Sequence, residues 1–307
     1  MTQSPGRHHP FAAFGVPNYR LFVGGFVCSS ATLQMLAVAV GWEIYERTGD
    51  ALLLGLAGLA RALPVIALAM FAGHLADVLD RKKMLIVTQF GFALAAGLLA
   101  VASSGGAPLW VLYAMLGLMG CARAFNGPSR NSLFPLLVPA SLFQNAVTWN
   151  ANVFQFSAIL GPLLAGGVIA ATGEAWPVYV MTSAGTAIMG FTVCFTRPAP
   201  QSRRLMGNPV EGFFEGARHM WRDRVLWGAI SLDMFAVLLG GATALLPLFA
   251  RDTLGAGPVG LGLLRSAPYA GALVMGLVLA HRPAFRRAGP TLRRGHPGHQ
   301  RHGRVSY

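Results

Sequence analysis

The sequence predicts an all-α polytopic membrane protein, and three observations carry that prediction. Hydrophobic residues make up 54% of the 307 residues and charged residues only 11%, against about 25% charged in an average soluble domain. The apolar residues come in long blocks, and about twenty residues are enough to cross about 30 Å of hydrocarbon. The basic residues gather in alternate connections between the blocks, which is typical of loops on the cytoplasmic side. A soluble protein has too much surface to cover with so few charges.

The first segment, residues 1–20, is polar and basic, and we expect it to stay in the cytoplasm. The first span is predicted from Leu21 to Val40. Trp42 and Tyr45 follow, where an aromatic belt at the membrane interface is expected. A nearly charge-balanced outer loop comes next, with Glu43, Glu46, Arg47 and Asp50.

The second span begins at Ala51, and the third covers Met84 to Val101. A short charged turn, Gly73 to Lys83, lies between them, and its three consecutive cations place it on the cytoplasmic side. The fourth span is predicted from Pro108 to about Phe125. A connection broken by three prolines then reaches Pro139.

The residues from Ser141 to Gln144 have the capping-box pattern, in which Ser reaches forward and Gln reaches back over the first turn of a helix. The pattern predicts the start of a fifth span, Leu142 to Ala171. The remaining spans are predicted at Trp176 to Phe195, Val225 to Phe249 and Val259 to Ala280. An even number of spans places both termini on the same, cytoplasmic side.

The last stretch, residues 281–307, changes character abruptly: it holds seven Arg, four His and no acid. One interpretation is a basic disordered tail. The other is a reading-frame slip, because the apolar pattern stops where another span is due. The downstream nucleotide sequence distinguishes the two.

Several classes of function are excluded or disfavoured by the residues. The formal charge of +13 follows the topology, so we assign it to orientation and to anionic headgroups, not to nucleic acid. Cys28, Cys121 and Cys194 lack metal-ligand spacing, and no metal site is expected. No Walker loop and no hydrolase or metalloprotease motif occurs, so we expect neither a cofactor nor an enzyme.

The charged turn resembles the signature between spans two and three of the major facilitator superfamily, Gly-x-Leu-x-Asp-Arg-x-Gly-Arg-Arg/Lys. The matching residues are Gly73, Leu75, Asp77, Arg81 and Lys82, and the departures are Val78 and Asp80. The resemblance implies a cytoplasmic gate in which Asp77 pairs with a basic residue at the inner end of span four. Arg130 is the candidate partner and Arg123 the weaker one. The alternative is a topogenic turn that only holds orientation.

The fifth span resembles the antiporter motif of the same superfamily, Gly-x-x-x-Gly-Pro-x-x-Gly-Gly. In this register the chain places small residues on one helix face, which allows close helix approach, and a proline that permits a bend. The alternative is tight packing alone. The residues are Ser157, Gly161, Pro162, Ala165 and Gly166.

Two further stretches, 125–139 and 245–268, look like the enterobactin-exporter-like branch of bacterial effluxers, also called transmembrane secretion effectors. The resemblance implies a major facilitator-type bundle in the bacterial inner membrane, with twelve helices in two halves and a substrate cavity between them. This chain offers about eight, so we expect a C-terminally truncated member. The expected parts are a cytoplasmic N-terminus (1–20), a six-helix half (21–195), a cytoplasmic loop (196–224), two helices of an incomplete second half (225–280) and the basic tail (281–307).

Polar side chains within spans are candidates for the cavity or for coupling, because each is costly in lipid unless it faces a cavity or a partner. Asp233 is the candidate proton carrier, since an acid in a cavity can change its protonation. The alternative is a structural ion pair of Asp233 with Arg265 or Arg61. The full set is Gln34, Arg61, Asn152, Gln155, Asp233 and Arg265.

Together these features predict a secondary transporter that exports a small organic molecule, siderophore- or drug-like, by proton antiport. Its expected partners are the lipid bilayer, the substrate and protons. The alternative is a truncated, non-transporting membrane remnant or interaction protein.

Overall fold

The computed structural model describes residues 11–199, 227, 228, 231, 234 and 245–280, with the backbone alone at 74, 76–78 and 276–280. Every regular element in this part of the chain is a helix, which confirms the all-α prediction. Six of the described helices are long and apolar enough to cross a membrane. They are α1 (Pro17–Thr48), α2 (Ala51–Val78), α3 (Arg81–Ser104), α4 (Leu109–Leu133), α5 (Phe143–Thr172) and α6 (Trp176–Phe195).

Short helical turns connect or precede the long helices: η1 (Ala12–Gly15), η2 (Phe134–Leu137), η3 (Ala140–Leu142), α9 (Leu246–Leu248) and η5 (Phe249–Thr253). The last long helix, α10, covers Gly257–Ala280. The chain divides by its internal contacts into residues 1–269 and 270–307, so the last turns of α10 form the described part of the second unit. Most of the predicted loop 196–224, most of the predicted seventh span and all of the tail 281–307 lie outside the described residues.

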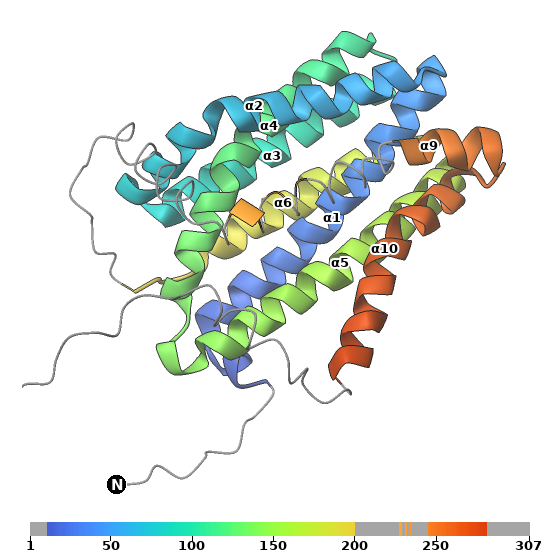
Figure 1. The fold of residues 1–307 in the computed structure, drawn as a ribbon. Coiled ribbons are helices and arrows are strands. Elements are labelled where there is room, and N and C mark those ends of the chain that lie inside the picture. The colour runs from blue at the N-terminus through green and yellow to red at the C-terminus, as the bar shows by residue number, and fades with distance from the viewer. Residues whose placement is uncertain (1–10, 200–226, 229–230, 232–233, 235–244, 281–307) are drawn as a thin grey trace, which may run out of the picture. The chain divides into compact units, whose positions relative to one another are not determined.

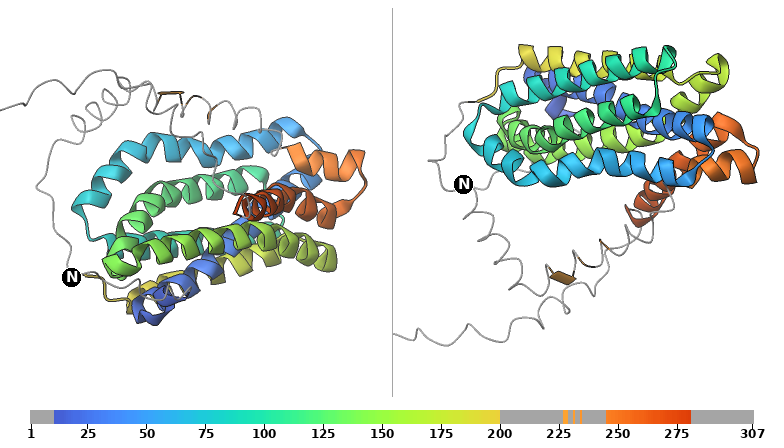
Figure 2. Two further views of the ribbon diagram at one scale, coloured as in Figure 1. Left: turned by 60° about the horizontal axis from the view of Figure 1, so that its bottom comes forward. Right: turned by 90° about the horizontal axis from the view of Figure 1, so that it is seen from above.

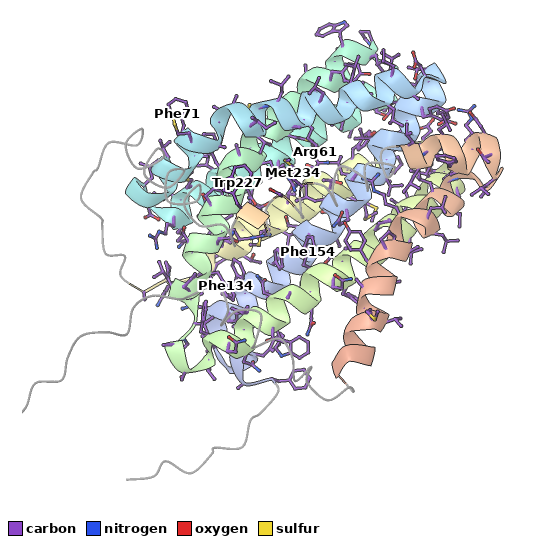
Figure 3. All side chains as sticks on the ribbon, viewed as in Figure 1. Arg61, Phe71, Phe134, Phe154, Trp227 and Met234 are labelled. Carbon is purple, nitrogen blue, oxygen red and sulfur yellow. The ribbon has the colours of Figure 1, made fainter. Side chains whose placement is uncertain are left out.

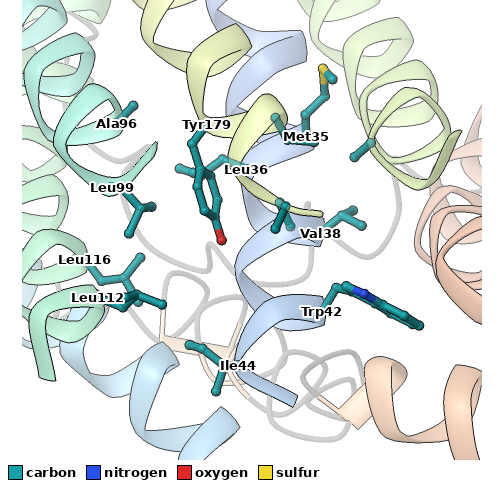
Figure 4. Packing of buried hydrophobic residues seen from close by; sticks show 14 of the residues in the cluster. Met35, Leu36, Val38, Trp42, Ile44, Ala96, Leu99, Leu112, Leu116 and Tyr179 are labelled. Carbon is teal, nitrogen blue, oxygen red and sulfur yellow. The ribbon is translucent and has the colours of Figure 1, made fainter. Parts of the chain in front are cut away.

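Helix α1 is the centre of the first unit, because it packs along both α5 and α6 (Figure 1). Helix α3 packs against α6 and α4, and α4 packs against α2. Aliphatic and aromatic side chains fill the space between α1, α3, α4 and α6 (Figure 4), among them Leu36, Leu99, Leu116 and Tyr179, each at most 2% exposed. In a membrane, close van der Waals packing of such side chains stabilises the contacts between the helices.

Polar caps and glycines define the helix ends. The Asp50 carboxylate accepts from the backbone N–H of Leu52 at 2.8 Å and caps the start of α2. The C-caps that follow α1 and α5 are Gly49 and Gly173, with φ of 65° and 75°. Only glycine adopts this left-handed conformation at no steric cost, so both ends are fixed by the sequence.

The predicted end of the first span was wrong, since α1 continues beyond Val40 to Thr48. Trp42 and Tyr45 are 8% and 3% exposed and belong to the core, not to an interfacial belt. The Tyr45 hydroxyl donates to the Asp252 carboxylate on η5, which lies beside this end of α1 (Figure 2). The helix continues because the polar side chains near its C-terminal end form hydrogen bonds and an ion pair within the protein. These residues therefore do not need to lie in a loop exposed to water.

Two predictions around span four were also wrong. Helix α4 runs past Phe125 to Leu133, with Pro128 inside it. Proline removes a single backbone donor, and the Ser129 hydroxyl donates to the Phe125 carbonyl at 2.6 Å within the same turn. The capping box predicted for Ser141 and Gln144 is not formed. Ser141 belongs to the turn η3, and the N-cap of α5 is Leu142, which makes no side-chain cap hydrogen bond.

Candidate functional site

A cavity of about 750 Å³ opens among α1, α2, α4, α5 and α10. Pockets for small organic molecules typically measure about 300–1,000 Å³, so the cavity has room for such a ligand. Its walls combine apolar and polar side chains, and α3 adds Gln89 and Phe92. The polar residues that line it are Ser29, Ser30, Gln34, Arg61, Gln89, Arg123, Asn126, Arg130, Arg265 and Tyr269.

Four arginines converge on this cavity from three helices: Arg61 from α2, Arg123 and Arg130 from α4, and Arg265 from α10. Figure 3 shows Arg61 on α2 and the lining residue Phe154 on α5. Among the described residues that line the cavity there is no carboxylate. The described wall therefore carries a strong positive charge.

Two of the arginines are held in place by the protein. Arg265 donates from Nη1 to the Ala37 carbonyl on α1 at 2.9 Å. The Arg130 guanidinium carbon lies 4.9 Å from the centre of the Phe26 ring, a cation–π contact. Its buried Nε has no hydrogen-bond partner among the described residues.

The predicted cavity residues have four different outcomes. Gln34, Arg61 and Arg265 line the cavity. Gln155 donates to the Tyr269 carbonyl at 2.5 Å and joins α5 to α10. Asn152 is exposed and is absent from the described lining, and Asp233 lies outside the described residues.

The charged turn between α2 and α3 is only two residues long, Leu79 and Asp80. The Asp80 carboxylate accepts from the backbone N–H groups of Lys82 at 2.9 Å and Lys83 at 3.2 Å. Asp80, which departs from the family signature, is therefore the N-cap of α3.

The cations of this turn hold the ends of two other helices. Arg81 donates to the Ser132 carbonyl on α4 at 3.3 Å. Lys82 donates to the carbonyls of Cys194 at 2.9 Å and Thr196 at 2.8 Å, where α6 ends. A cation is favourable at a helix C-terminus. The side chain of Asp77 is not described, so its pairing with Arg130 stays a prediction; Gly73 has open space around it.

The small-residue face of α5 touches two helices. All five of its members, Ser157 to Gly166, are buried. A Cβ added at Gly161 would lie 2.6 Å from the Ala31 carbonyl on α1, and one at Gly166 would lie 2.6 Å from the Pro258 carbonyl on α10. A Cβ added at Gly262 of α10 would lie 2.5 Å from the Pro162 carbonyl. The backbones of α1, α5 and α10 therefore approach as closely as glycine allows.

A buried acid network at the other end of α1 was missed from the sequence. Glu43 is 5% exposed and accepts from the Tyr179 hydroxyl at 2.5 Å and the Ser103 hydroxyl at 2.8 Å. Arg47 pairs with it at 2.5 Å and also donates to the Ala107 carbonyl at 2.9 Å. The i, i+4 spacing of Glu43 and Arg47 is typical of a helical ion pair and was the available signal. Arg123 was also missed as a cavity residue.

Comparison with known proteins agrees with the fold. The family model of the Major Facilitator Superfamily matches residues 22–295. A solved bacterial homolog of the human lysosomal transporter Spinster, inward-facing and unoccupied, superposes with a TM-score of 0.61. It has 17% sequence identity, with 89% of this chain and 65% of that chain covered, and so speaks for the fold alone.

Curated relatives include several efflux proteins. Macrolide efflux protein A of Streptococcus pyogenes is 26% identical over 268 residues, which cover 85% of this chain and 65% of that protein. Multidrug efflux pump Tap of Mycobacterium bovis is 28% identical over 270 residues, which cover 81% and 63%. The Staphyloferrin A transporter of Staphylococcus aureus is 24% identical over 155 residues, which cover 50% and 37%. The chain spans just under two thirds of the first of these relatives and less of the others. These matches support assignment to the superfamily. The assignment to the enterobactin-exporter-like branch stays a prediction.

Proposed function

Because the chain belongs to the Major Facilitator Superfamily, we propose that it is a secondary active transporter that exports a small organic molecule, siderophore- or drug-like, by proton antiport. The names of its relatives, macrolide efflux protein and multidrug efflux pump, support export. They favour transport over the alternative of a non-transporting membrane protein.

The observation that carries the proposal is the cavity. Five helices of the first six-helix segment and α10 line one space with room for a small organic molecule. Substrate sites of such transporters lie at the interface between two helical bundles that rock against each other. We place the substrate in this cavity, with Gln34, Arg61 and Arg265 among its contacts.

The face of α5 supports antiport. Gly161 packs on α1 while Pro162 and Gly166 pack on α10, so this face lies between the six-helix segment and the helix beyond it. A joint with so little space transmits a small shift of one helix to its neighbours. We propose that Asp233 carries the proton, and that the Asp77–Arg130 pair latches the cytoplasmic end, with both termini in the cytoplasm.

The test uses everted membrane vesicles from an efflux-deficient bacterial host that expresses the full chain. Radiolabelled erythromycin, ethidium and anionic carboxyfluorescein are the export probes, and an acid interior supplies the proton gradient. We expect uptake of at least one probe that nigericin abolishes. Uptake no greater than in vesicles without the chain, for all three probes, contradicts the proposal.

Two glycines of α5 provide a matched pair for the same assay. A Cβ at Gly161 would clash with the α1 backbone, whereas Gly167 has nothing within 4 Å. We therefore expect Gly161→Ala to reduce uptake strongly and Gly167→Ala to leave it unchanged. Equal uptake by the two variants would remove the α5 face from the mechanism.

A further inference from the structure

We infer that the cavity binds a small organic anion, whose carboxylate or phosphate group is held by Arg61, Arg123 and Arg265. This inference rests on the proposed transport function and adds the charge class of the substrate. The names of several relatives refer to macrolides or to drugs in general and indicate no charge for the substrate. The charge class is therefore inferred from the cavity of this chain.

The first argument is the charge balance of the described wall. Arg61, Arg123, Arg130 and Arg265 line one cavity, and their like charges repel one another. In the part of the chain that the structure describes, the one ion pair is that of Arg47 with Glu43, which lies outside the cavity. The cavity arginines therefore face each other without a described counter-charge.

The second argument is the hydrogen bonding of the arginines. Arg61 and Arg123 donate no side-chain hydrogen bond to any described residue, and Arg265 makes one described bond, to the Ala37 carbonyl. A cation in a membrane-spanning segment is costly unless it meets water or a partner. A guanidinium offers five donors in a planar fork that matches a carboxylate or a phosphate bidentately, so an anion satisfies these groups where a neutral molecule does not.

The third argument is the rest of the wall. Phe26, Phe92 and Phe154 line the same cavity together with Tyr269. Such aromatic side chains suit the apolar body of an organic molecule, while the polar side chains of the same wall orient it. The low dielectric of the surroundings strengthens attraction of an anion and repulsion of a cation alike. The ligand that fits is an amphipathic, aromatic carboxylate or phosphate.

The test compares two dyes that share a xanthene ring system and differ in charge. The full chain is placed in phosphatidylcholine nanodiscs, and binding of anionic carboxyfluorescein and cationic rhodamine 6G is measured by fluorescence anisotropy. We expect carboxyfluorescein to bind about 10-fold tighter or more, since a charged hydrogen bond contributes at least that factor. Equal binding of both dyes, or tighter binding of rhodamine 6G, overturns the inference.

Variants assign the binding to the arginines. We expect Arg61→Gln and Arg123→Gln each to weaken carboxyfluorescein binding about 10-fold, and Arg61→Lys to weaken it less. Arg197→Gln, at an exposed position after α6 that does not line the cavity, is the matched control and should change nothing. Arg123 is itself exposed, so its variant tests the inference even where Arg61→Gln does not fold. Unchanged binding in the Arg123→Gln variant overturns it.

Two further arms separate the sources of the anion and the two proposals. Adding phosphatidylglycerol to the nanodiscs should leave dye binding intact; competition by that lipid would assign the arginines to a lipid headgroup and overturn the inference. Carboxyfluorescein binding without gradient-driven uptake of any probe would contradict the transport proposal alone. Gradient-driven uptake of ethidium without carboxyfluorescein binding would contradict this inference alone.

Discussion

The packing of α5 on α1 makes a quantitative prediction for Gly161. A Cβ at this position would lie 2.6 Å from the Ala31 carbonyl oxygen, 2.7 Å from Gln34 Cβ and 3.3 Å from the Met35 nitrogen. Ordinary contacts measure about 3.5–4.0 Å. The Ala31 oxygen and the Met35 nitrogen belong to the helix backbone and cannot rotate away. The Gly161→Ala variant therefore requires α5 and α1 to separate.

The free energy of this change is the balance of two effects. Overpacking of a tight interface costs about 1–3 kcal/mol, while replacing glycine by alanine within a helix gains about 1 kcal/mol. At Gly167, where nothing lies within 4 Å of the added atom, only the gain applies. We expect the free energies of unfolding of Gly161→Ala and Gly167→Ala to differ by about 2 kcal/mol, with Gly167→Ala the more stable.

The assay is thermal unfolding of the purified full chain in a mild detergent, followed by tryptophan fluorescence. Wild type should melt between the two variants, and Gly161→Ala should melt several degrees below Gly167→Ala. A Gly161→Ala variant that melts with or above Gly167→Ala would show that the α1–α5 contact is not tight in the membrane protein, and the reasoning about the α5 face would fail.

Three further variants test other parts of the structure. Glu43→Gln removes the partner of Arg47 and weakens the bond from Tyr179, so it should cost about 1–3 kcal/mol in the same unfolding assay, whereas the exposed Glu46→Gln should cost nothing. Asp80→Ala removes the cap of α3 and should cost about 1 kcal/mol, while Asp80→Asn, which keeps an acceptor, should cost little; equal melting of the two contradicts the assigned cap. Asp77→Arg and Arg130→Asp should each abolish vesicle uptake, and the double variant should restore it in part; a double variant as inactive as both singles argues against the proposed latch.

The long helices were predictable because a membrane leaves the backbone few choices. Every N–H and C=O group within lipid must be satisfied inside the segment, so an apolar block translates directly into a helix. The sixth span, Trp176 to Phe195, agrees with α6 at both ends. The end of α1 was missed because Glu43 and Arg47 read as loop residues, and only the pairing with Ser103 and Tyr179 shows that a helix accommodates them.

The site was less predictable than the fold because its contacts join distant parts of the chain. Arg61 and Arg265 were recognised as single costly charges, but their convergence with Arg123 depends on how α2, α4 and α10 pack. The bond from Gln155 to the Tyr269 carbonyl joins residues 114 positions apart. The cap formed by Asp80 involves only the turn that follows it in the sequence. It was therefore predictable from the sequence, although Asp80 was noted only as a departure from the family signature.

Gradient-driven transport of an organic anion tests the central claim most directly. Everted vesicles with an acid interior are incubated with carboxyfluorescein, and the dye retained is quantified after lysis. We expect uptake by the full chain that nigericin abolishes, that Arg61→Gln loses and that Arg197→Gln keeps. Uptake that ignores the proton gradient, or that equals the uptake of vesicles without the chain, would contradict an anion–proton antiporter with this arginine-lined cavity as its site.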